Sequence, residues 1–422
     1  MRIRCSLEAV LLLLPVILSA QIPENQEARE RFRELVLAPL SQGAAVPASL
    51  LPQSQGPRVA FRTETMNGAL YYLFLNEEGS SFPIAGSGSW IIKRERADGQ
   101  FLQAKVYFRS DPGCFLRLFP AEGRTSADVY LFGLQVDRKV LLPLAFTELL
   151  FQPFQYIRQL SEAVVRWDLL LYTGNPEADR HAERLLAGIR AALPGLRQAD
   201  DGAMDAQGRY VHIADLSAQE DPSGGGGLNC SGFAKWITDG FVYPLTGSYL
   251  EITALKRRHL ESRGNRWSSR FEESRDPYFG LDWSRNLALA LQAAAGFSGL
   301  GPESSDVRDL PYLRYREDVG YPVEELPLAL FLDAREHPGS LYLGSLNREF
   351  GQDPALRQHY HLIAFLPYFT AEGAFRVAAF DTGQESSVEA IKSRFAGHFV
   401  HLVRLDASGE FSAPAPGGSR NR

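Results

Sequence analysis

A cysteine at the start of an aromatic helix is the residue of this chain best suited to act as a nucleophile. Cys230 follows a run of four glycines and the pair Leu228-Asn229. Apolar side chains then recur at the spacing of one helical face, at Phe233, Trp236, Ile237 and Phe241. A helix N-terminus favours the thiolate form of cysteine, and its backbone N–H groups can hold an oxyanion. The segment therefore predicts acyl chemistry at Cys230.

Two other interpretations of this cysteine remain open. Cys230 could cap a buried helix without any chemistry, or it could form a disulfide with Cys114, the second cysteine that export would leave in the chain. Serine chemistry fits less well, because Ser231 lacks a nucleophile-elbow pattern and Lys235 follows it by four residues rather than three.

A cysteine nucleophile needs an imidazole nearby, and two histidines lead one apolar strand. His359 and His361 precede Leu362-Ile363-Ala364-Phe365, and a spacing of two places both on one face, so alternation does not choose between them. Asp381 ends the next expected strand, after the turn Thr370–Gly373, and could hold the imidazole in place. It could equally belong to an ordinary turn.

A metal site is the alternative use of the same histidines. The pair His359 and His361, with Asp381, His398 or His401, could bind zinc. The spacings typical of zinc sites, Cys-x-x-Cys and His-Glu-x-x-His, do not occur around these residues. We therefore expect no metal and no cofactor.

Several segments resemble the NlpC-type cell-wall cysteine peptidases, a papain-like family. Asn229-Cys230-Ser231-Gly232-Phe233 resembles that family's Asp-Cys-Ser-Gly-Phe signature. Pro338–Leu343 resembles its Pro-Gly-Asp-Leu strand, and His361–Phe365 resembles its His-Val-Gly-Ile-Tyr strand, which carries the base. Arg209–His212 is similar to its Pro-Tyr-Val-Trp segment, whose tyrosine supports the oxyanion site.

The resemblance implies roles for five residues and a substrate. Peptidoglycan stem peptide, or another envelope peptide, would be cleaved at an amide bond by Cys230, with His361 as base and Asp381 as its partner. Tyr210 and Ser231 would lie at the oxyanion and substrate site. The chain departs from the family at Asn229 and Ser340, where the family has aspartate, and in the long insertion 244–337.

The ends and the overall charge of the chain restrict its surroundings and partners. Residues 1–20 combine two early arginines, an apolar run and small residues before Gln21, as in a cleaved signal peptide. No later run is long enough to span a membrane, and no cysteine follows the cleavage point to carry a lipid. We expect a secreted or periplasmic protein without a membrane span. The net charge of −6 argues against nucleic acid as the partner.

The predicted fold class is α+β, with a papain-like hydrolase domain whose nucleophile helix packs on an antiparallel sheet. A linker with a short helix (21–57), a small β-rich domain (58–145) and a helical segment (146–200) should precede the catalytic domain (201–407). The tail 408–422 should be disordered.

Basic residues concentrate in 256–275 of the insertion, as on a solvated surface or an anion-binding face. The rival functions are a non-catalytic envelope binding protein and an acyltransferase using the same dyad.

Overall fold

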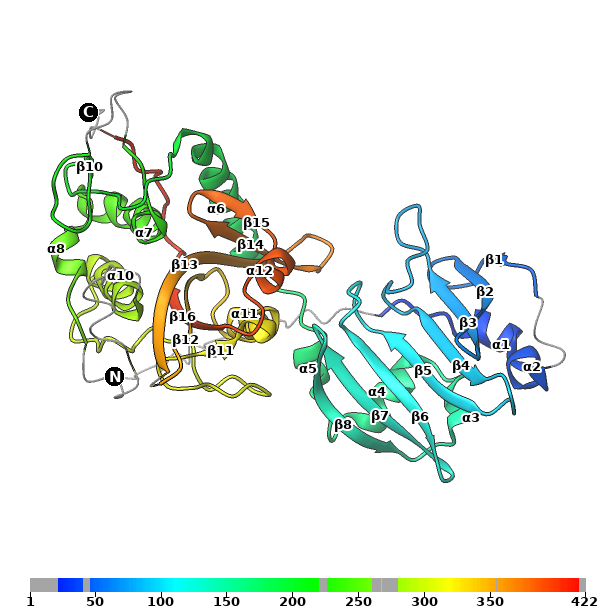
Figure 1. Cartoon of the computed structure of the whole chain (residues 1–422). Coiled ribbons are helices and arrows are strands. Elements are labelled where there is room, and N and C mark those ends of the chain that lie inside the picture. The colour runs from blue at the N-terminus through cyan, green and yellow to red at the C-terminus, as the bar shows by residue number, and fades with distance from the viewer. Residues whose placement is uncertain are drawn as a thin grey trace, which may run out of the picture.

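The computed structural model describes residues 22–40, 46–219, 226–259, 267, 280–353 and 355–416. The chain forms two lobes, each built around an antiparallel sheet (Figure 1). The predicted signal peptide, most of the basic run in 256–275 and residues 417–422 of the predicted disordered tail lie outside the described residues.

The first lobe contains an eight-stranded antiparallel sheet in which the strands pair in chain order. Its strands are β1 (Ser49–Leu51), β2 (Val59–Met66), β3 (Ala69–Asn76), β4 (Trp90–Glu95), β5 (Phe101–Tyr107), β6 (Phe115–Ala121), β7 (Arg124–Leu131) and β8 (Leu134–Leu142). Tight hairpins produce this meander. Asn67 and Gly68 join β2 to β3 with positive φ angles of 50° and 76°, as a two-residue hairpin turn requires.

Short helices cover one face of this sheet. They are α1 (Gln26–Arg31), α2 (Arg33–Leu37), α3 (Phe146–Leu149), α4 (Phe154–Ser161) and α5 (Trp167–Leu170). Alternate strand residues such as Tyr72, Val106 and Val129 are buried together with apolar residues of these helices. Because side chains alternate between the two faces of a strand, the intervening residues form the opposite face.

The second lobe contains a six-stranded antiparallel sheet in the order β11-β16-β12-β13-β14-β15. Its strands are β11 (Tyr321–Pro322), β12 (Leu341–Phe350), β13 (Leu356–Phe369), β14 (Phe375–Asp381), β15 (Gln384–Ser386) and β16 (Phe399–Leu405). A separate two-stranded pair, β9 (Ala203–Met204) and β10 (Tyr210–Val211), lies near the helix that begins at Cys230.

Helices surround this second sheet. They are α6 (Pro176–Ala192), η2 (Leu193–Gly195), α7 (Cys230–Thr246), α8 (Ile252–Leu255), α10 (Leu281–Ala294), η5 (Val323–Glu325), α11 (Leu326–Glu336) and α12 (Val388–Arg394). The predicted insertion therefore supplies α8, α10, β11, η5 and α11 to the lobe. Asn175 caps α6 with its side chain and Pro176 takes the first helical position, as such a sequence favours.

The two lobes contact each other through aromatic side chains and through Arg109, whose half-buried guanidinium lies 5.0 Å from the Phe331 ring centroid. Phe132 of the first lobe lies 5.2 Å from Phe331 of α11 and 5.4 Å from Phe375 of β14, between ring centroids. Arg109 donates to the carbonyl oxygens of Leu170 and Tyr172. Burial lowers the pKa of Arg109 to about 10. One apolar core therefore runs from the first sheet into the second lobe.

The predicted papain-like fold class is wrong. The chain is dominated by the eight-stranded antiparallel sheet together with the second, six-stranded sheet, and no papain-like packing of a helix on a sheet is found among the described residues. The prediction failed because the motifs around Cys230 and His361 specify local features, a helix start and a strand. Such local features are compatible with many topologies, and a fold is not implied by a site.

Part of the tail that the sequence predicts to be disordered packs against the second lobe. Residues 408–416, expected to be disordered, pack along α7. There Phe411 contacts Trp236 and Phe241, and Ser412 N donates to Gly240 O at 2.9 Å.

No helix in the described part of the chain has both the length and the apolar character needed to cross a membrane.

Candidate active site

Cys230 is the first residue of α7, and the residue before it caps the helix. The Asn229 side-chain oxygen accepts from Gly232 N at 2.8 Å, and its carbonyl oxygen accepts from Phe233 N at 2.8 Å. Gly232 is required by packing, because a Cβ there would lie 1.9 Å from the Gly202 carbonyl oxygen. The capping asparagine and this glycine thus fix the start of the helix, and with it the position of the Cys230 side chain.

His361 and Asp381 lie together beside Cys230. The last paired residues of β13 and β14 are Ala364 and Phe380, so Asp381 follows directly on the last pair. His361 Nε2 lies 2.7 Å from Asp381 Oδ1, and the Cys230 side chain is close enough to the imidazole to raise its pKa. The structure thus brings together the three residues proposed from the sequence as nucleophile, base and orienting group. Their catalytic roles remain a prediction.

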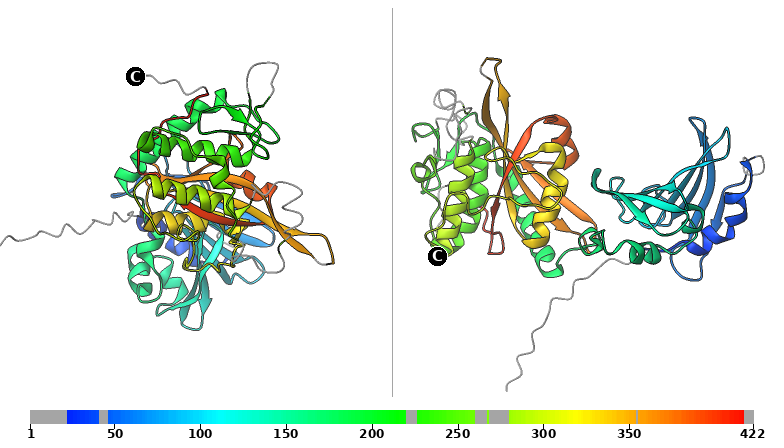
Figure 2. Two further views of the ribbon diagram at one scale, coloured as in Figure 1. Left: turned by 90° about the vertical axis from the view of Figure 1, so that its left-hand side faces the viewer. Right: turned by 90° about the horizontal axis from the view of Figure 1, so that it is seen from below.

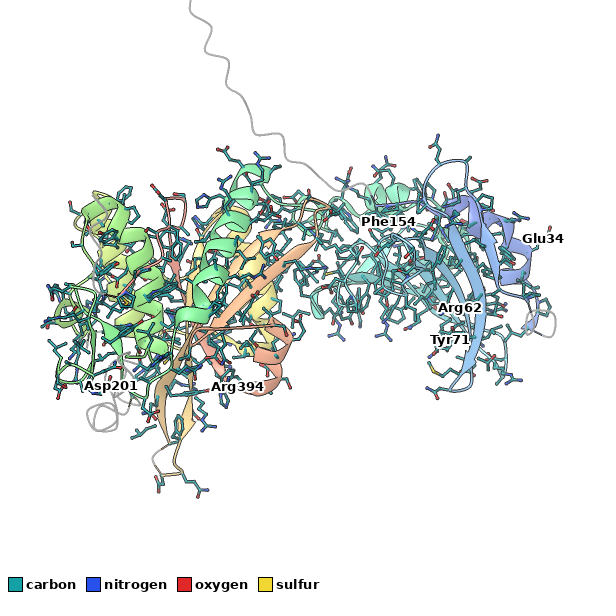
Figure 3. All side chains as sticks on the ribbon, turned by 90° about the horizontal axis from the view of Figure 1, so that it is seen from above. Glu34, Arg62, Tyr71, Phe154, Asp201 and Arg394 are labelled. Atoms are coloured by element: carbon teal, nitrogen blue, oxygen red, sulfur yellow. The ribbon has the colours of Figure 1, made fainter. Side chains whose placement is uncertain are left out.

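Arg394 and Thr382 hold the Asp381 carboxylate. Arg394 Nη1 lies 2.6 Å from Asp381 Oδ2, and Thr382 Oγ1 donates to Asp381 Oδ1 at 3.1 Å. Arg394 ends α12, thirteen residues after Asp381, and its position is labelled in Figure 3. Sequence analysis missed this arginine because a single charge at the end of a short helix gives no sign of its partner.

The contacts of His361 favour its charged form. Burial lowers the pKa of His361, but its interactions with Asp381 and Cys230 outweigh burial and raise it from its ordinary value to about 9. Burial also raises the pKa of Asp381, yet the hydrogen bond to His361 and the charge of Arg394 leave it lowered. Near neutral pH the pair therefore consists of an imidazolium and a carboxylate.

We expect the replacement Asp381→Asn to move the alkaline limb of the pH–rate profile to lower pH. The imidazolium of His361 persists up to about pH 9 in the folded protein, whereas an ordinary histidine loses its proton near about 6.5. If this imidazolium protonates the leaving group, kcat/KM should fall above about pH 9. Removing the carboxylate should lower that limb by about one pH unit or more.

The matched control for this experiment is Arg394→Gln, which removes the second partner of Asp381 but leaves the bond to His361. Its alkaline limb should move less than that of the asparagine variant. Profiles of kcat/KM between pH 5 and 11 for the three proteins decide the point. An alkaline limb that is the same in the wild type and the asparagine variant would contradict the assigned role of Asp381.

The two histidines of β13 have different surroundings, although the sequence placed them on one face. The pairing of β12 with β13 is regular up to Leu346↔His361 and resumes at Asn347↔His359, which leaves Tyr360 as the extra residue of a β-bulge. A bulge re-aims the side chains beside it. His359 is buried, with Nε2 3.1 Å from the Asp318 carbonyl oxygen and its ring stacked on Trp267.

The structure places Tyr210 and Ser231 close to the nucleophile segment. Tyr210 packs against the glycine loop before Cys230, since a Cβ at Gly226 would lie 2.1 Å from the Tyr210 Cβ. Its hydroxyl forms no hydrogen bond with another described residue. Ser231 is buried in α7, and its carbonyl oxygen accepts from Trp283 Nε1 of α10 at 3.0 Å. An oxyanion role for either residue remains a prediction.

The side chains proposed as an alternative zinc site make other contacts. His401 Nε2 lies 2.9 Å from the Tyr315 hydroxyl, and His398 Nδ1 lies 2.5 Å from the Tyr360 hydroxyl. Among the described residues, the acidic, histidine and cysteine side chains that meet closely enough to share a metal ion are Glu303, Glu317 and Asp318. Arg308 already pairs with Glu303 at 2.8 Å and Glu317 at 3.3 Å.

The second cysteine of the described chain lies in a different core. Cys114 is buried among the residues of the first sheet, and its sulfur accepts from Phe132 N at 3.4 Å. Burial raises the pKa of the Cys114 thiol well above its ordinary range. Both Cys114 and Cys230 are free, so the disulfide considered from the sequence is not formed in this structure.

A family model described as a domain of unknown function, DUF8515, matches residues 18–169. This range contains the eight-stranded sheet, helices α1 to α4 and most of α5, and it ends before Cys230, His361 and Asp381. Searches of curated proteins and of solved structures found no match.

Proposed function

We propose that the protein is an exported cysteine hydrolase that cleaves an amide bond through an acyl-enzyme on Cys230. The observation that carries the proposal is the proximity of Cys230, His361 and Asp381, in which a thiol at a helix N-terminus lies beside an imidazole that a carboxylate hydrogen-bonds at 2.7 Å. A nucleophile beside a base that a third group orients is the spatial arrangement that covalent acyl transfer uses.

In the first half of the proposed reaction, the Cys230 thiolate attacks the carbonyl carbon of the substrate amide and a C–S bond forms. The carbonyl oxygen becomes an oxyanion, which the Cys230 N–H can stabilise, because Asn229 accepts from Gly232 and Phe233 and not from Cys230. The His361 imidazolium then gives its proton to the amide nitrogen, the C–N bond breaks and the amine leaves.

In the second half, water attacks the thioester while neutral His361 takes a proton from that water. The C–S bond breaks, the carboxylic acid product leaves, and Cys230 and His361 return to the thiolate and imidazolium pair. Asp381 stays ionised throughout and holds the ring with its second nitrogen turned to the sulfur. Its ion pair with Arg394 opposes protonation of the carboxylate.

Peptidoglycan stem peptides are the proposed substrate. This part of the proposal rests on the resemblance of residues 210–243 and 338–383 to NlpC-type peptidases, and the predicted signal peptide would place the protein with such a substrate. It is tested by incubating the full-length chain with purified peptidoglycan fragments and analysing the products by mass spectrometry. Each cleaved amide should yield a new amine and a new carboxylic acid, with one water added.

The same experiment separates the rival functions. If an added amine acceptor is joined to the acyl fragment and no free acid appears, the protein is an acyltransferase. If the fragments bind but remain intact, the proposal fails in favour of a non-catalytic envelope protein.

A further inference from the structure

A cluster of polar and aromatic side chains lies directly beside the candidate base, at the bulge of β13. Tyr360 is the extra residue of that bulge, so it adjoins His361 in the chain. The Phe395 ring lies 5.8 Å from the His361 ring and 6.5 Å from the Tyr360 ring, between centroids. Because both rings meet Phe395, they lie on the same side of the sheet. We call Arg348, Tyr360, Phe395 and His398 the Tyr360 cluster.

The paired strands β12 and β13 bring an arginine to this cluster. Figure 2 shows these two strands extending as a hairpin past the helices of the second lobe. Arg348 of β12 follows two residues after Leu346, which pairs with His361, and a spacing of two returns to the same face of a strand. The Arg348 guanidinium carbon lies 4.4 Å from the Phe350 ring centroid and 5.6 Å from the Tyr360 ring centroid. The two rings therefore hold this cation beside the cluster.

Arg348 has no acidic partner in the described part of the chain. No carboxylate oxygen there lies within 4.0 Å of its guanidinium, and Nη1 instead lies 3.4 Å from His398 Nε2. Glu349, its neighbour in β12, points to the opposite face of the strand and pairs with Arg357 at 3.1 Å. Glu324, the acid beside His398, accepts from a backbone N–H at 2.7 Å. The charge of Arg348 is therefore open to an added anion.

The hydrogen bonds of His398 leave the Tyr360 hydroxyl with a proton to donate. A guanidinium can only donate, so His398 Nε2 accepts from Arg348. A neutral imidazole then carries its proton on Nδ1, which donates to the Tyr360 oxygen at 2.5 Å. Burial lowers the pKa of His398, and the charge of Arg348 lowers it further against a smaller effect of Glu324, which favours this neutral form. The Tyr360 O–H is therefore directed away from His398 and can be donated to a ligand.

Arg394 adds a second positive charge beside the same hydroxyl. Burial raises the pKa of Tyr360 to about 12, and the charges of Arg348 and Arg394 oppose that rise, so both guanidinium groups lie near the hydroxyl. Arg394 Nη1 pairs with Asp381 at 2.6 Å, but the arginine side chain is 61% exposed. The cluster thus presents one unpaired cation, one O–H donor and the partly neutralised charge of Arg394 to a single anionic group.

We propose that the Tyr360 cluster binds a carboxylate of the substrate, next to the amide bond that Cys230 would attack. Arg348 and the Tyr360 O–H would both donate to the carboxylate, and hydrogen bonds to a charged group are stronger than those between neutral groups. This assignment rests on the proposed function, since Tyr360 adjoins the proposed base and a group bound there would belong to the reacting substrate. The substrate class then narrows to peptides with an acidic side chain or a free α-carboxylate close to the cleaved amide.

The proposal is tested by comparing peptidoglycan fragments that have free carboxylates with the same fragments after conversion of their carboxylates to amides. Isothermal titration calorimetry on the full-length Cys230→Ala variant, which lacks the nucleophile, measures binding without turnover. We expect amidation to weaken binding by about tenfold or more, the scale of one hydrogen bond to a charged group. Arg348→Gln in the same background should weaken binding of the free fragments by a similar factor and change binding of the amidated fragments by less than about twofold.

Two further variants separate a specific contact from general charge and from loss of folding. Tyr360→Phe removes only the O–H donor and should also weaken binding of the free fragments more than that of the amidated ones. Arg180→Gln, on the exposed side of α6, removes the same charge elsewhere and should leave binding within about twofold. Thermal midpoints verify folding, and Tyr360→Phe carries the test if Arg348→Gln unfolds. Equal binding of free and amidated fragments, or equal losses in Arg348→Gln and Arg180→Gln, would overturn the proposal.

A measurement without peptidoglycan distinguishes failure of the carboxylate site from failure of the hydrolase. N-acetylglutamate titrated into the wild-type chain should shift the NMR signals of the His398 ring, N-acetylglutamine should not, and neither should shift them in Arg348→Gln. This response in a chain that cleaves no fragment would refute the hydrolase and support the carboxylate site. Cleavage of fragments without this response would overturn the carboxylate site alone. A stronger response to inorganic phosphate than to N-acetylglutamate would overturn the choice of a carboxylate.

Discussion

Replacement of Cys230 by alanine should lower kcat/KM on peptidoglycan fragments by about 10⁴-fold or more. In the proposed reaction the Cys230 sulfur forms the bond to the substrate, and removal of a covalent nucleophile costs hydrolases with such triads on the order of 10⁴- to 10⁶-fold. Alanine has the highest helix propensity, so α7 should keep its start at this position. The variant should therefore remain folded, which far-UV circular dichroism and the thermal midpoint would verify.

The other free cysteine provides the control for this variant. Cys114→Ala removes a sulfur atom from the core of the first sheet and should cost about 1 kcal/mol of folding free energy. Because Cys114 is not part of the Cys230–His361–Asp381 series, kcat/KM should stay close to that of the wild type. Activity that survives in the Cys230 variant, or that disappears equally in both variants, would contradict a nucleophilic role for Cys230.

A second measurement does not require knowledge of the substrate. In the wild type, iodoacetamide at neutral pH should modify Cys230 faster than Cys114, since only Cys230 has an imidazole partner and a helix N-terminus. In the alanine variant, the pKa of His361 should fall from about 9, because the interaction with the Cys230 thiol that helps to raise it is lost. An NMR titration of the His361 ring would detect that change even if no cleaved bond is known.

The elements next to the candidate site could be predicted because their signals are local. The helix at Cys230, the apolar strand after His361 and the strand that ends at Asp381 all follow from periodicity within short windows. The turn from Thr370 to Gly373 likewise joins β13 to β14. A hairpin brings its two ends together whatever the rest of the fold does, so the proximity of His361 and Asp381 could be expected.

The surroundings of α7 could not be predicted, because they depend on distant segments. Lys235 and Asp239 have the i,i+4 spacing that is common for ion pairs on helix surfaces, yet both are fully buried and joined at 2.5 Å. The helix is enclosed from several sides: Trp283 of α10 bonds the Ser231 carbonyl oxygen, and Phe411 of the C-terminal segment packs at Gly240. These contacts join residues tens to hundreds of positions apart, for which a single sequence carries no signal.

The insertion also contributed structure that its sequence did not indicate. Arg285 of α10 is buried between Asp306 at 2.6 Å and Asp318 at 2.9 Å. Charges scattered along a sequence usually indicate a surface. Only the folded chain shows that Arg285 pairs with both aspartates and that Arg308 lies 2.8 Å from Asp306 as a second cation. The same segment positions the Asp318 carbonyl oxygen against His359, which removes that histidine from the candidate site.

His361→Ala should lower kcat/KM by about 10²- to 10⁴-fold, the usual contribution of a general acid and base. His359→Gln should instead leave kcat/KM within a few-fold and mainly lower stability, because His359 contacts Trp267 and the Asp318 carbonyl oxygen. The two variants are matched, since both residues lie on β13 on either side of the same bulge. Steady-state kinetics and thermal unfolding of both proteins provide the comparison.

Three outcomes would distinguish the possible roles of these histidines. Partial recovery of His361→Gly by added imidazole would indicate that the missing group acts on a proton, because a free imidazole can replace the function but not the packing. The reverse order, with the greater catalytic loss at His359, would contradict the assignment that the bulge at Tyr360 directs His361 to the sulfur. Activity that a chelator removes and zinc restores would contradict the cysteine mechanism itself, since the thiol–imidazole pair needs no metal to form its acyl-enzyme.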